Sequence, residues 1–219
     1  LGQDKLLNDK YFKNQKNGVF CEVGAYDGIT MSNTYYFEKN LNWTGICIEP
    51  RPDLFEKVKK NRNCIKIFGG AYSSETELDF NMCGREGLSG LVKDYDQPHI
   101  RRINRECIEH KVINKIIKTK LYRLETIFDM NNITVVDFIT IDTEGSELEV
   151  LKGINFKKVH INIICIEDNY PGTEKSKKIT EHLINNNYVL KHRLYQDFIY
   201  EHKDLKFSWE NREIASQNN

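Results

Sequence analysis

The chain has 219 residues, of which 29% are charged and 39% are hydrophobic, as is ordinary for a globular domain with a substantial core. Its 32 basic and 32 acidic side chains give a formal net charge of zero, so no overall field attracts nucleic acid or an anionic membrane. No apolar run approaches the roughly 20 residues that span a bilayer, so we expect one domain over residues 1–219, without a nucleic-acid partner or a membrane span.

Short apolar strands alternate with helical patterns along most of the chain. Nearly continuous apolar runs are typical of parallel strands that helices cover on both faces. The predicted strands are Val19–Val23, Gly45–Glu49, Ile65–Phe68, Val135–Asp142 and Ile161–Glu167. The predicted helices are Ser32–Asn40, Pro52–Asn61, Ser146–Lys152, with a capping box of Ser146 and Glu149, and Thr173–Asn186. Tyr188–Leu194 and Gln196–His202 alternate in polarity and predict a C-terminal antiparallel hairpin.

Residues 81–123 interrupt this alternation, and we interpret them as an insertion on the substrate side of the domain. A Gly-rich loop, Cys83–Gly90, precedes an amphipathic helical pattern that extends to Ile116 and Ile117. Between His99 and Lys120 this segment holds seven Lys or Arg against two acids. The charge pattern fits a solvated helix face or the attraction of an anionic substrate, such as a phosphorylated or nucleotide-linked sugar.

The first strand ends in a glycine turn, Glu22-Val23-Gly24-Ala25-Tyr26-Asp27-Gly28. Gly24 and Gly28 permit a tight turn and the close approach of a nucleotide-like ligand. Tyr26 replaces the central glycine of a dinucleotide fingerprint, and Glu22 would repel a pyrophosphate. A ligand with an ammonium and a sulfonium group tolerates that carboxylate, so the motif favours S-adenosylmethionine.

Two further strands end in acids. Glu49, followed by Pro50, is placed to accept hydrogen bonds from ribose hydroxyls, although NAD would use the same acid. The segment Ile139–Glu147 brings Asp142, Glu144 and Glu147 to the C-terminal edge of the sheet, where ligands of open α/β sheets bind. Carboxylates this close raise one another's pKa and can hold a proton, a metal ion or a substrate hydroxyl.

In order and spacing, the blocks EVGAYDG, ICIEP and IDTEGSELEVLKG resemble the signature of the FkbM-type methyltransferase family. The similarity covers about Leu1 to Tyr170 and is weakest from Asn81 to Lys120. It implies an α/β, Rossmann-like class I methyltransferase fold, with a mostly parallel seven-stranded sheet, a C-terminal antiparallel hairpin and helices on both faces. It also implies S-adenosylmethionine as cofactor and a sugar, glycan or other small-molecule hydroxyl as acceptor. The predicted cofactor-binding residues are Glu22, Val23, Gly24, Ala25, Asp27, Gly28, Asn33, Glu49, Pro50, Ala71, Ser89 and Asp142.

For catalysis we expect Asp142, Glu144 or Glu167 to take the proton of the acceptor hydroxyl. A divalent ion held by Asp142 and Glu167 is a further option, although the spacing does not demand one. His99 is the one histidine that merits a test. Two other functions stay open, an NAD-dependent oxidoreductase and an inactive, methyltransferase-like binding module. Methylation of nucleic-acid bases is disfavoured, because an Asp/Asn-Pro-Pro-aromatic element does not follow the strand that ends at Asp142.

The cysteines do not form a recognisable metal site, since none belongs to a CxxC pair or a Cys/His cluster. Four of the six lie in apolar runs, where a free thiol packs as a small core side chain. The first 18 residues lack the apolar core of a signal peptide. We therefore expect a reducing, cytoplasmic compartment, although a removed leader stays open because numbering starts at Leu1.

Overall fold

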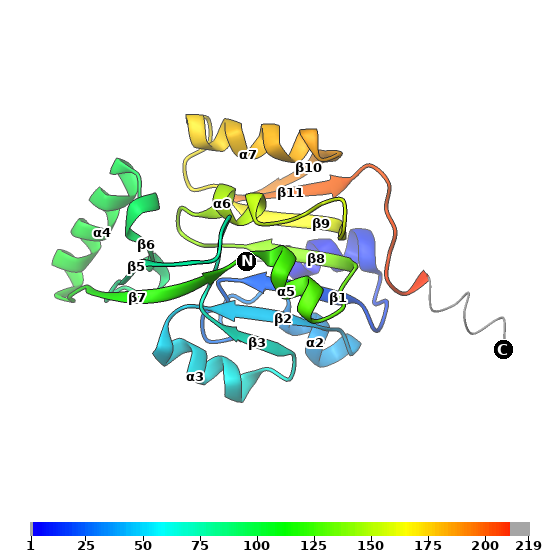
Figure 1. Ribbon diagram of the computed structural model, residues 1–219, viewed down its shortest axis with the longest axis horizontal. Coiled ribbons are helices and arrows are strands. Elements are labelled where there is room, and N and C mark those ends of the chain that lie inside the picture. The colour runs from blue at the N-terminus through cyan, green and yellow to red at the C-terminus, as the bar shows by residue number, and fades with distance from the viewer. Residues whose placement is uncertain (1, 211–219) are drawn as a thin grey trace.

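A computed structural model describes residues 2–210 of the chain. Its main sheet has seven strands in the order β10-β11-β9-β8-β1-β2-β3, at the centre of the molecule in Figure 1. The bounds are β1 Val19–Val23, β2 Thr44–Glu49, β3 Ile65–Phe68, β8 Val135–Ile141, β9 His160–Glu167, β10 Tyr188–Leu194 and β11 Asp197–His202. Five of these strands were predicted nearly to the residue from their apolar runs.

The parallel part of the sheet is formed by β9, β8, β1, β2 and β3, which pair in parallel in that order. The hairpin of β10 and β11 is antiparallel, and β11 pairs antiparallel with β9. This arrangement confirms the predicted mostly parallel sheet with a C-terminal hairpin. Because β1 and β8 are neighbours, the segments that follow Val23 and Ile141 meet at one edge of the sheet.

Helices cover both faces of the sheet and give the domain two apolar cores. On one face, α5 (Leu124–Met130), α6 (Glu147–Lys152) and α7 (Glu174–Asn185) pack against the sheet. On the other face lie α1 (Gln3–Leu7), a π-helical segment (Asn8–Phe12), α2 (Tyr35–Leu41) and α3 (Pro52–Asn61). Alternate residues of one strand enter the two cores, as Phe20 and Cys21 of β1 do.

A second sheet extends from the main one, in the order β4-β7-β5-β6 (Figure 1). It comprises β4 (Gly70–Ala71), β5 (Thr76–Met82), β6 (Gly90–Leu91) and β7 (Lys115–Tyr122) and is accompanied by α4 (Gln97–His110). The predicted insertion over 81–123 covers most of it, and its first strands begin earlier in the chain. The predicted continuation of the helix to Ile116 and Ile117 is wrong, because α4 ends at His110 and both isoleucines lie on β7, paired with β5.

The capping box predicted for α6 is also absent. Ser146 does not cap the helix with its side chain, because its hydroxyl donates to Asp94 at 2.8 Å. Glu149 instead accepts from Ser73 at 2.5 Å. These contacts tie α6 to the second sheet and its loops.

Within the described residues all six cysteines are free, and five are buried. None of the helices among residues 2–210 is long and apolar enough to cross a membrane.

Candidate active site

A cavity of about 690 Å³ opens at the carboxyl ends of the central strands, between the main sheet and the segment that carries α4. Ten of the twelve residues predicted to bind the cofactor line it, namely Glu22, Val23, Gly24, Ala25, Asn33, Glu49, Pro50, Ala71, Ser89 and Asp142. The predicted catalytic residues Glu144 and Glu167 line it too. The topology therefore gathers three separate sequence motifs around one cavity.

The glycine turn after β1 is as tight as its sequence predicts. Gly24 has a φ of 84°, and a Cβ atom there would lie 1.9 Å from the carbonyl oxygen of Asp142. The amides of Gly24 and Ala25 both donate to the carbonyl of Ile48 at 3.0 Å. Because β1, β2 and β8 converge here, only glycine fits at position 24.

Glu49 is buried at the end of β2 and organises the loops around it. Its two carboxylate oxygens accept from the amides of Tyr26 at 2.8 Å and Arg51 at 2.9 Å. Burial raises its pKa to about 8, against the lowering effect of these hydrogen bonds. Glu49 also lines the cavity, so its carboxyl group lies beside a ligand hydroxyl bound there.

Glu22 lines the cavity, but other side chains already engage its carboxylate. The guanidinium of Arg62 donates to it at 2.8 Å, and neither side chain has more than 4% exposure. The hydroxyls of Ser32 and Thr34 also donate to it, at 2.9 and 2.7 Å. Since Arg62, Ser32 and Thr34 already engage the carboxylate, Glu22 does not present to the cavity the free negative charge that its motif predicted.

Asp27 and Gly28 do not line the cavity. Asp27 accepts from the amides of Ile29 and Thr30 at 2.8 and 2.7 Å and so closes the loop that follows the glycine turn. At Gly28, whose φ is 83°, a Cβ atom would lie 2.9 Å from the side chain of Arg62. Both residues shape the loop around the buried arginine.

Three acids converge at the ends of β8 and β9. Asp142, Glu144 and Glu167 each offer one oxygen atom within 4.8 Å of the others. Burial, followed by the charge of Asp142, raises the pKa of both Glu144 and Glu167. Burial also raises the pKa of Asp142, to about 6, against a hydrogen bond from Glu167. At neutral pH the two glutamates therefore hold protons, and Asp142 is the ionised member of the cluster.

Asn169, which follows β9, supports the cluster by donating its amide to Glu167 at 2.6 Å and to Glu144 at 3.3 Å. Glu147, which the sequence places at the same edge of the sheet, accepts from Thr143 and Gly145 at 3.2 and 2.8 Å. It therefore holds the loop between β8 and α6 and does not face the cavity.

The helix α4 closes the far side of this region. His99 is buried, stacks on Tyr95 with ring centroids 4.6 Å apart, and lies with Nδ1 3.4 Å from Glu144. Burial lowers its pKa, so the imidazole is neutral. Arg102, one turn further along α4, lies 3.9 Å from Glu144 and lines the cavity.

Several residues of the cavity wall were not predicted from the sequence. Gln3 is buried and donates to Asp197 at the start of β11, and both line the cavity. Arg51 donates to the carbonyl of Cys83 at 2.8 Å and to Ser89 at 3.1 Å, which fixes the Gly-rich loop. The sequence could not have identified Gln3 and Asp197, because they lie 194 positions apart and only the C-terminal hairpin brings them together.

Solved structures of similar shape include several S-adenosylmethionine-dependent enzymes. Fibrillarin of Aeropyrum pernix, solved with bound S-adenosyl-L-methionine, has 11% identity and a TM-score of 0.48, over 91% of this chain and 72% of that one. A methyltransferase FkbM of Methylobacillus flagellatus has 15% identity and a TM-score of 0.48, over 85% of this chain and 44% of that one. TrmK of M. capricolum, solved with S-adenosyl-homocysteine, has 12% identity and a TM-score of 0.45, over 93% and 71% of the two chains.

None of the curated proteins matches the chain. The family model of the methyltransferase FkbM domain, however, matches residues 22–196. That range begins at Glu22 of the glycine turn and includes Glu49 and all three acids of the cluster. The chain therefore belongs to the FkbM family of S-adenosylmethionine-dependent methyltransferases.

Proposed function

We propose that this protein methylates a hydroxyl oxygen on a sugar, glycan or other small molecule. The observation that carries this proposal is the acid cluster of Asp142, Glu144 and Glu167, whose oxygen atoms lie within 4.8 Å of one another at the edge of the cavity. Burial raises the pKa of all three acids. An aliphatic hydroxyl is a poor nucleophile while it keeps its proton, so it needs an adjacent base. The cluster supplies one at the edge of the cavity where the cofactor motifs meet.

The residues around the cavity fit S-adenosylmethionine. Glu49 lines the cavity at the end of β2, where its carboxyl group can hydrogen-bond to the ribose hydroxyls, and the Gly24 turn lets the ligand approach the backbone closely. The ionised Asp142 favours a ligand that carries an ammonium and a sulfonium group. When bound, this cofactor supplies a methyl carbon whose leaving group is a neutral thioether.

In the reaction that we propose, the acceptor oxygen attacks the methyl carbon in line, and Asp142 takes the hydroxyl proton. Glu167 donates a hydrogen bond to Asp142, which keeps that carboxylate ionised at neutral pH. Positioning supplies most of the remaining acceleration, since an in-line displacement depends on the alignment of its reacting atoms. Glu144 and Glu167 keep their protons and orient the base.

An anionic group on the acceptor would complement the cations of the insertion. Arg85 and Arg102 line the same cavity as the acid cluster, on its α4 side. A phosphate or carboxylate bound there would leave a hydroxyl of the same molecule free to reach Asp142. This favours a phosphorylated or nucleotide-linked sugar among the candidate acceptors.

A divalent cation is the second candidate for the acid cluster. Oxygen ligands from carboxylates suit Mg²⁺, and Asp142, Glu144 and Glu167 would supply three of them. Such an ion would polarise the acceptor oxygen and replace the protons of the glutamates. Turnover that survives chelation by EDTA would assign the cluster to proton transfer alone.

Calorimetric titration of S-adenosylmethionine and, separately, of NAD into the purified protein tests the cofactor assignment. We expect S-adenosylmethionine to bind and NAD not to bind. Glu49→Ala should weaken the binding by about fivefold or more, because a hydrogen bond contributes about 1 kcal/mol. If NAD bound instead, the oxidoreductase would replace this proposal. If the cofactor bound but the protein methylated none of a panel of hydroxyl acceptors, the result would support the alternative of an inactive binding module.

A further inference from the structure

The turn that joins α4 to β7 carries the two most exposed isoleucines of the described chain. Ile108, in the last turn of α4, is 80% exposed, and Ile113, in the connection to β7, is 86% exposed. Ile116, at the start of β7, is exposed as well. We call the segment from Ile108 to Ile116 the α4–β7 tip. It lies at the end of the second sheet that is far from the main sheet, on the left of Figure 1.

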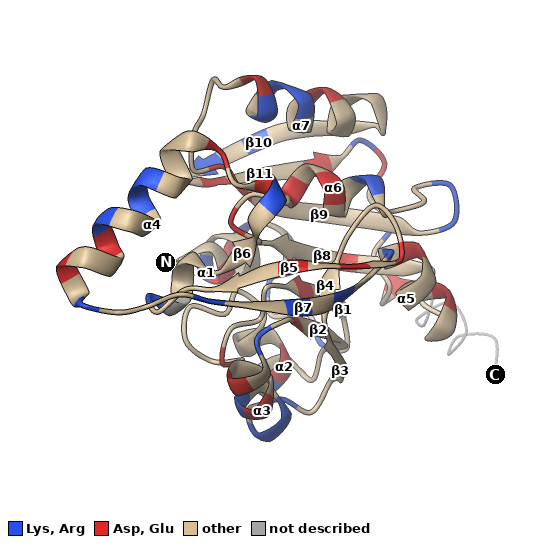
Figure 2. Ribbon diagram, turned by 60° about the vertical axis from the view of Figure 1, so that its left-hand side comes forward, with Lys and Arg blue, Asp and Glu red and all other residues tan. Residues whose placement is uncertain are grey.

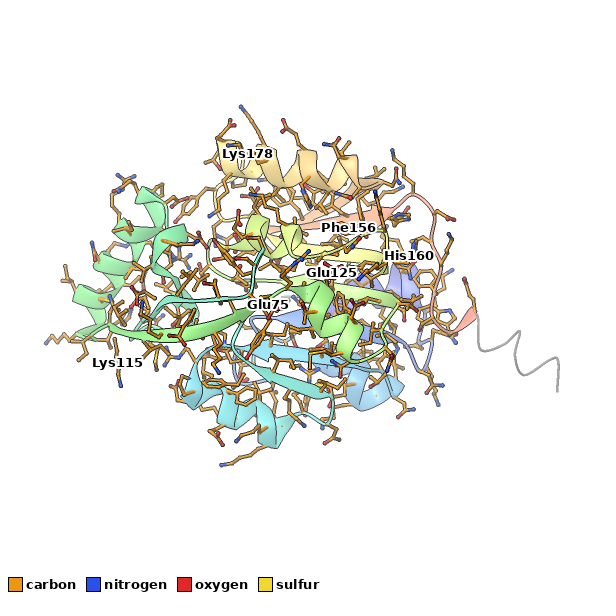
Figure 3. All side chains as sticks on the ribbon, viewed as in Figure 1. Glu75, Lys115, Glu125, Phe156, His160 and Lys178 are labelled. Carbon is orange, nitrogen blue, oxygen red and sulfur yellow. The ribbon has the colours of Figure 1, made fainter. Side chains whose placement is uncertain are left out.

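Lysines separate these isoleucines. Lys111 and Lys115 are exposed, and Glu109 is the only acid within the tip. Neither lysine is paired with a carboxylate of residues 2–210. In Figure 2 the ribbon is blue, for Lys and Arg, at positions along α4 and at the start of β7, and Figure 3 shows Lys115 pointing outward from the molecule. The formal net charge of the chain is zero, but a local cluster still acts within a Debye length of about 10 Å.

The packing of the turn keeps these isoleucines exposed to solvent. Lys111 has a left-handed φ of 53° and ends the helix, and the amide of Val112 donates to the carbonyl of Cys107 at 3.1 Å. Val112 packs inward against Gly84, where a Cβ atom would lie 2.5 Å from the Val112 side chain. With Val112 fixed inward, Ile113 is held in solvent.

We propose that the α4–β7 tip docks onto the surface of an anionic lipid bilayer. Isoleucines can enter the boundary between headgroups and acyl chains while neighbouring lysines bind lipid phosphates, and this is the composition of membrane-surface anchors. A protein partner is less suited, because lysine is depleted at the buried centre of protein interfaces. Each lysine near an anionic bilayer strengthens binding by about fivefold.

The tip also adjoins the rim of the cavity. Gly84, against which Val112 packs, lines the cavity together with Arg85, and Arg85 lies 3.6 Å from Glu106 of α4. Docking through the tip would therefore bring the cavity rim close to the bilayer. The docking itself does not depend on which acceptor is methylated.

Vesicle flotation of the whole chain tests this proposal, with vesicles of phosphatidylcholine alone or mixed with phosphatidylglycerol. We expect the wild-type protein to float only with the anionic vesicles and to be released as salt is raised. Lys111→Gln with Lys115→Gln should reduce the partition coefficient by about 25-fold. Ile108→Ser with Ile113→Ser should reduce it by about tenfold or more.

The matched control is Ile184→Ser with Lys177→Gln on α7, at another part of the surface. Ile184 is 51% exposed, and Lys177 is exposed on the same helix. This variant should float like the wild type, and thermal unfolding should show that all variants remain folded. The proposal is overturned if the wild type stays at the bottom of the gradient with anionic vesicles, or if the tip variants float as it does. A lipid-free dimer that Ile108→Ser with Ile113→Ser dissociates would overturn it too, by assigning the tip to a second copy of the chain.

Discussion

Asp142 lies between the glycine turn that follows β1 and the two other acids of the cluster. It follows β8, its backbone oxygen contacts the Gly24 turn, and its side chain accepts a hydrogen bond from Glu167. Glu167 stabilises the charge of Asp142, because a protonated Glu167 donates to it and does not repel it. A carboxylate with a pKa of about 6 is ionised at neutral pH and yet more basic than an ordinary aspartate.

Asp142→Asn should therefore lower kcat at saturating S-adenosylmethionine by about 100-fold or more while the protein stays folded. Asparagine keeps the shape of the side chain but cannot take a proton. In the wild type, kcat should rise with pH through about 6, as Asp142 loses its proton, and this limb should vanish in the variant. A fixed-time methyl-transfer assay across pH measures both effects.

Asp137 gives the matched control, since it is a buried acid at the opposite end of β8. It accepts from the amide of Val19 at 2.7 Å and from Ser208, far from the cavity. Asp137→Asn should cost stability and leave kcat within a few-fold of the wild type. Equal losses of kcat in the two variants would mean that Asp142 acts through the fold and not as the base.

Arg62 is the residue on which the loops beside the cavity depend. Its side chain has no exposed surface and donates to Glu22 at 2.8 Å and to Glu38 at 2.7 Å. Its guanidinium also donates to the carbonyl of Gly28 at 3.2 Å and to Thr34 at 2.8 Å. Removing one partner of a buried ion pair leaves an uncompensated charge, which costs more than the pair contributes.

Arg62→Met should lower the free energy of unfolding by about 3–5 kcal/mol, which urea denaturation measures. Arg123 provides the comparison, because it pairs with Glu125 at 2.6 Å while 41% of its side chain is exposed. Arg123→Met should cost less than about 1 kcal/mol. If Glu22→Gln restored none of the stability lost in Arg62→Met, the unpaired Glu22 would not be the cause of that loss.

At the level of elements, the parts that could be predicted are those whose pattern is local. Val19–Val23 is buried at every position, and apolar at all but Glu22, because helices cover both of its faces. Pro52 begins α3, where backbone N–H groups have no intrahelical acceptor and the missing N–H of proline costs nothing. Glu49 and Asp142 could be identified because an acid directly after a buried strand must lie at its carboxyl end.

The second sheet could not be predicted in the same way. Its outer face is charged, as the pairs Asp79–Lys118 and Glu77–Lys120 across β5 and β7 show. Strands so rich in Lys and Glu have low intrinsic preference for β structure, and their pairing joins segments about 40 residues apart. The partners of Glu22 were hidden for the same reason, since Arg62 lies 40 positions away.

The helix α4 connects the insertion to the catalytic centre, and its first turn is held by a side-chain cap. Asp96 accepts from the amide of His99 at 2.8 Å, and His99 lies against Glu144. In α7, Thr173 caps the helix in the same way through Ser176 at 3.3 Å. The two caps are chemically similar, but only the first fixes a residue of the active site.

Asp96→Ala and Thr173→Ala should each lower stability by about 1 kcal/mol. Only Asp96→Ala should also speed amide hydrogen exchange in the first turn of α4 and lower turnover, because His99 and Arg102 lose their fixed positions. Hydrogen exchange followed by mass spectrometry gives the first readout without any acceptor. Unchanged exchange in α4 would show that packing on Tyr95, and not the cap, holds this helix.

At the scale of the whole molecule, the fold concentrates acids with raised pKa values around one cavity. Burial raises the pKa of Glu49 to about 8 and of Asp142 to about 6, and it raises those of Glu144 and Glu167. Between the usual carboxyl pKa of about 4 and its raised value, each of these acids is more protonated in the folded chain than in the unfolded chain. Stability therefore falls as pH rises through the folded pKa values.

Three histidines change the stability of the fold with pH in the opposite direction, over a lower range of pH. Burial lowers the pKa of His99, His160 and His182, so the folded chain binds fewer protons there, and stability rises as pH approaches their usual value of about 6.5. Above that value these histidines are neutral in both states. Above neutral pH, the change of the free energy of unfolding with pH is therefore due to the acids with raised pKa values.

From about pH 7 upward, the free energy of unfolding of the protein without cofactor should therefore decrease, and Glu49→Gln should flatten that decrease. One proton taken up by the folded state alone corresponds to about 1.4 kcal/mol per pH unit, so the two urea titration series should diverge by up to this slope. Asp27→Asn is the control: although burial acts to raise the pKa of Asp27, hydrogen bonds from Ile29 and Thr30 lower it, so it titrates far below this range. Parallel lines for the wild type and Glu49→Gln would mean that Glu49 stays ionised in the folded protein, held by the amides of Tyr26 and Arg51.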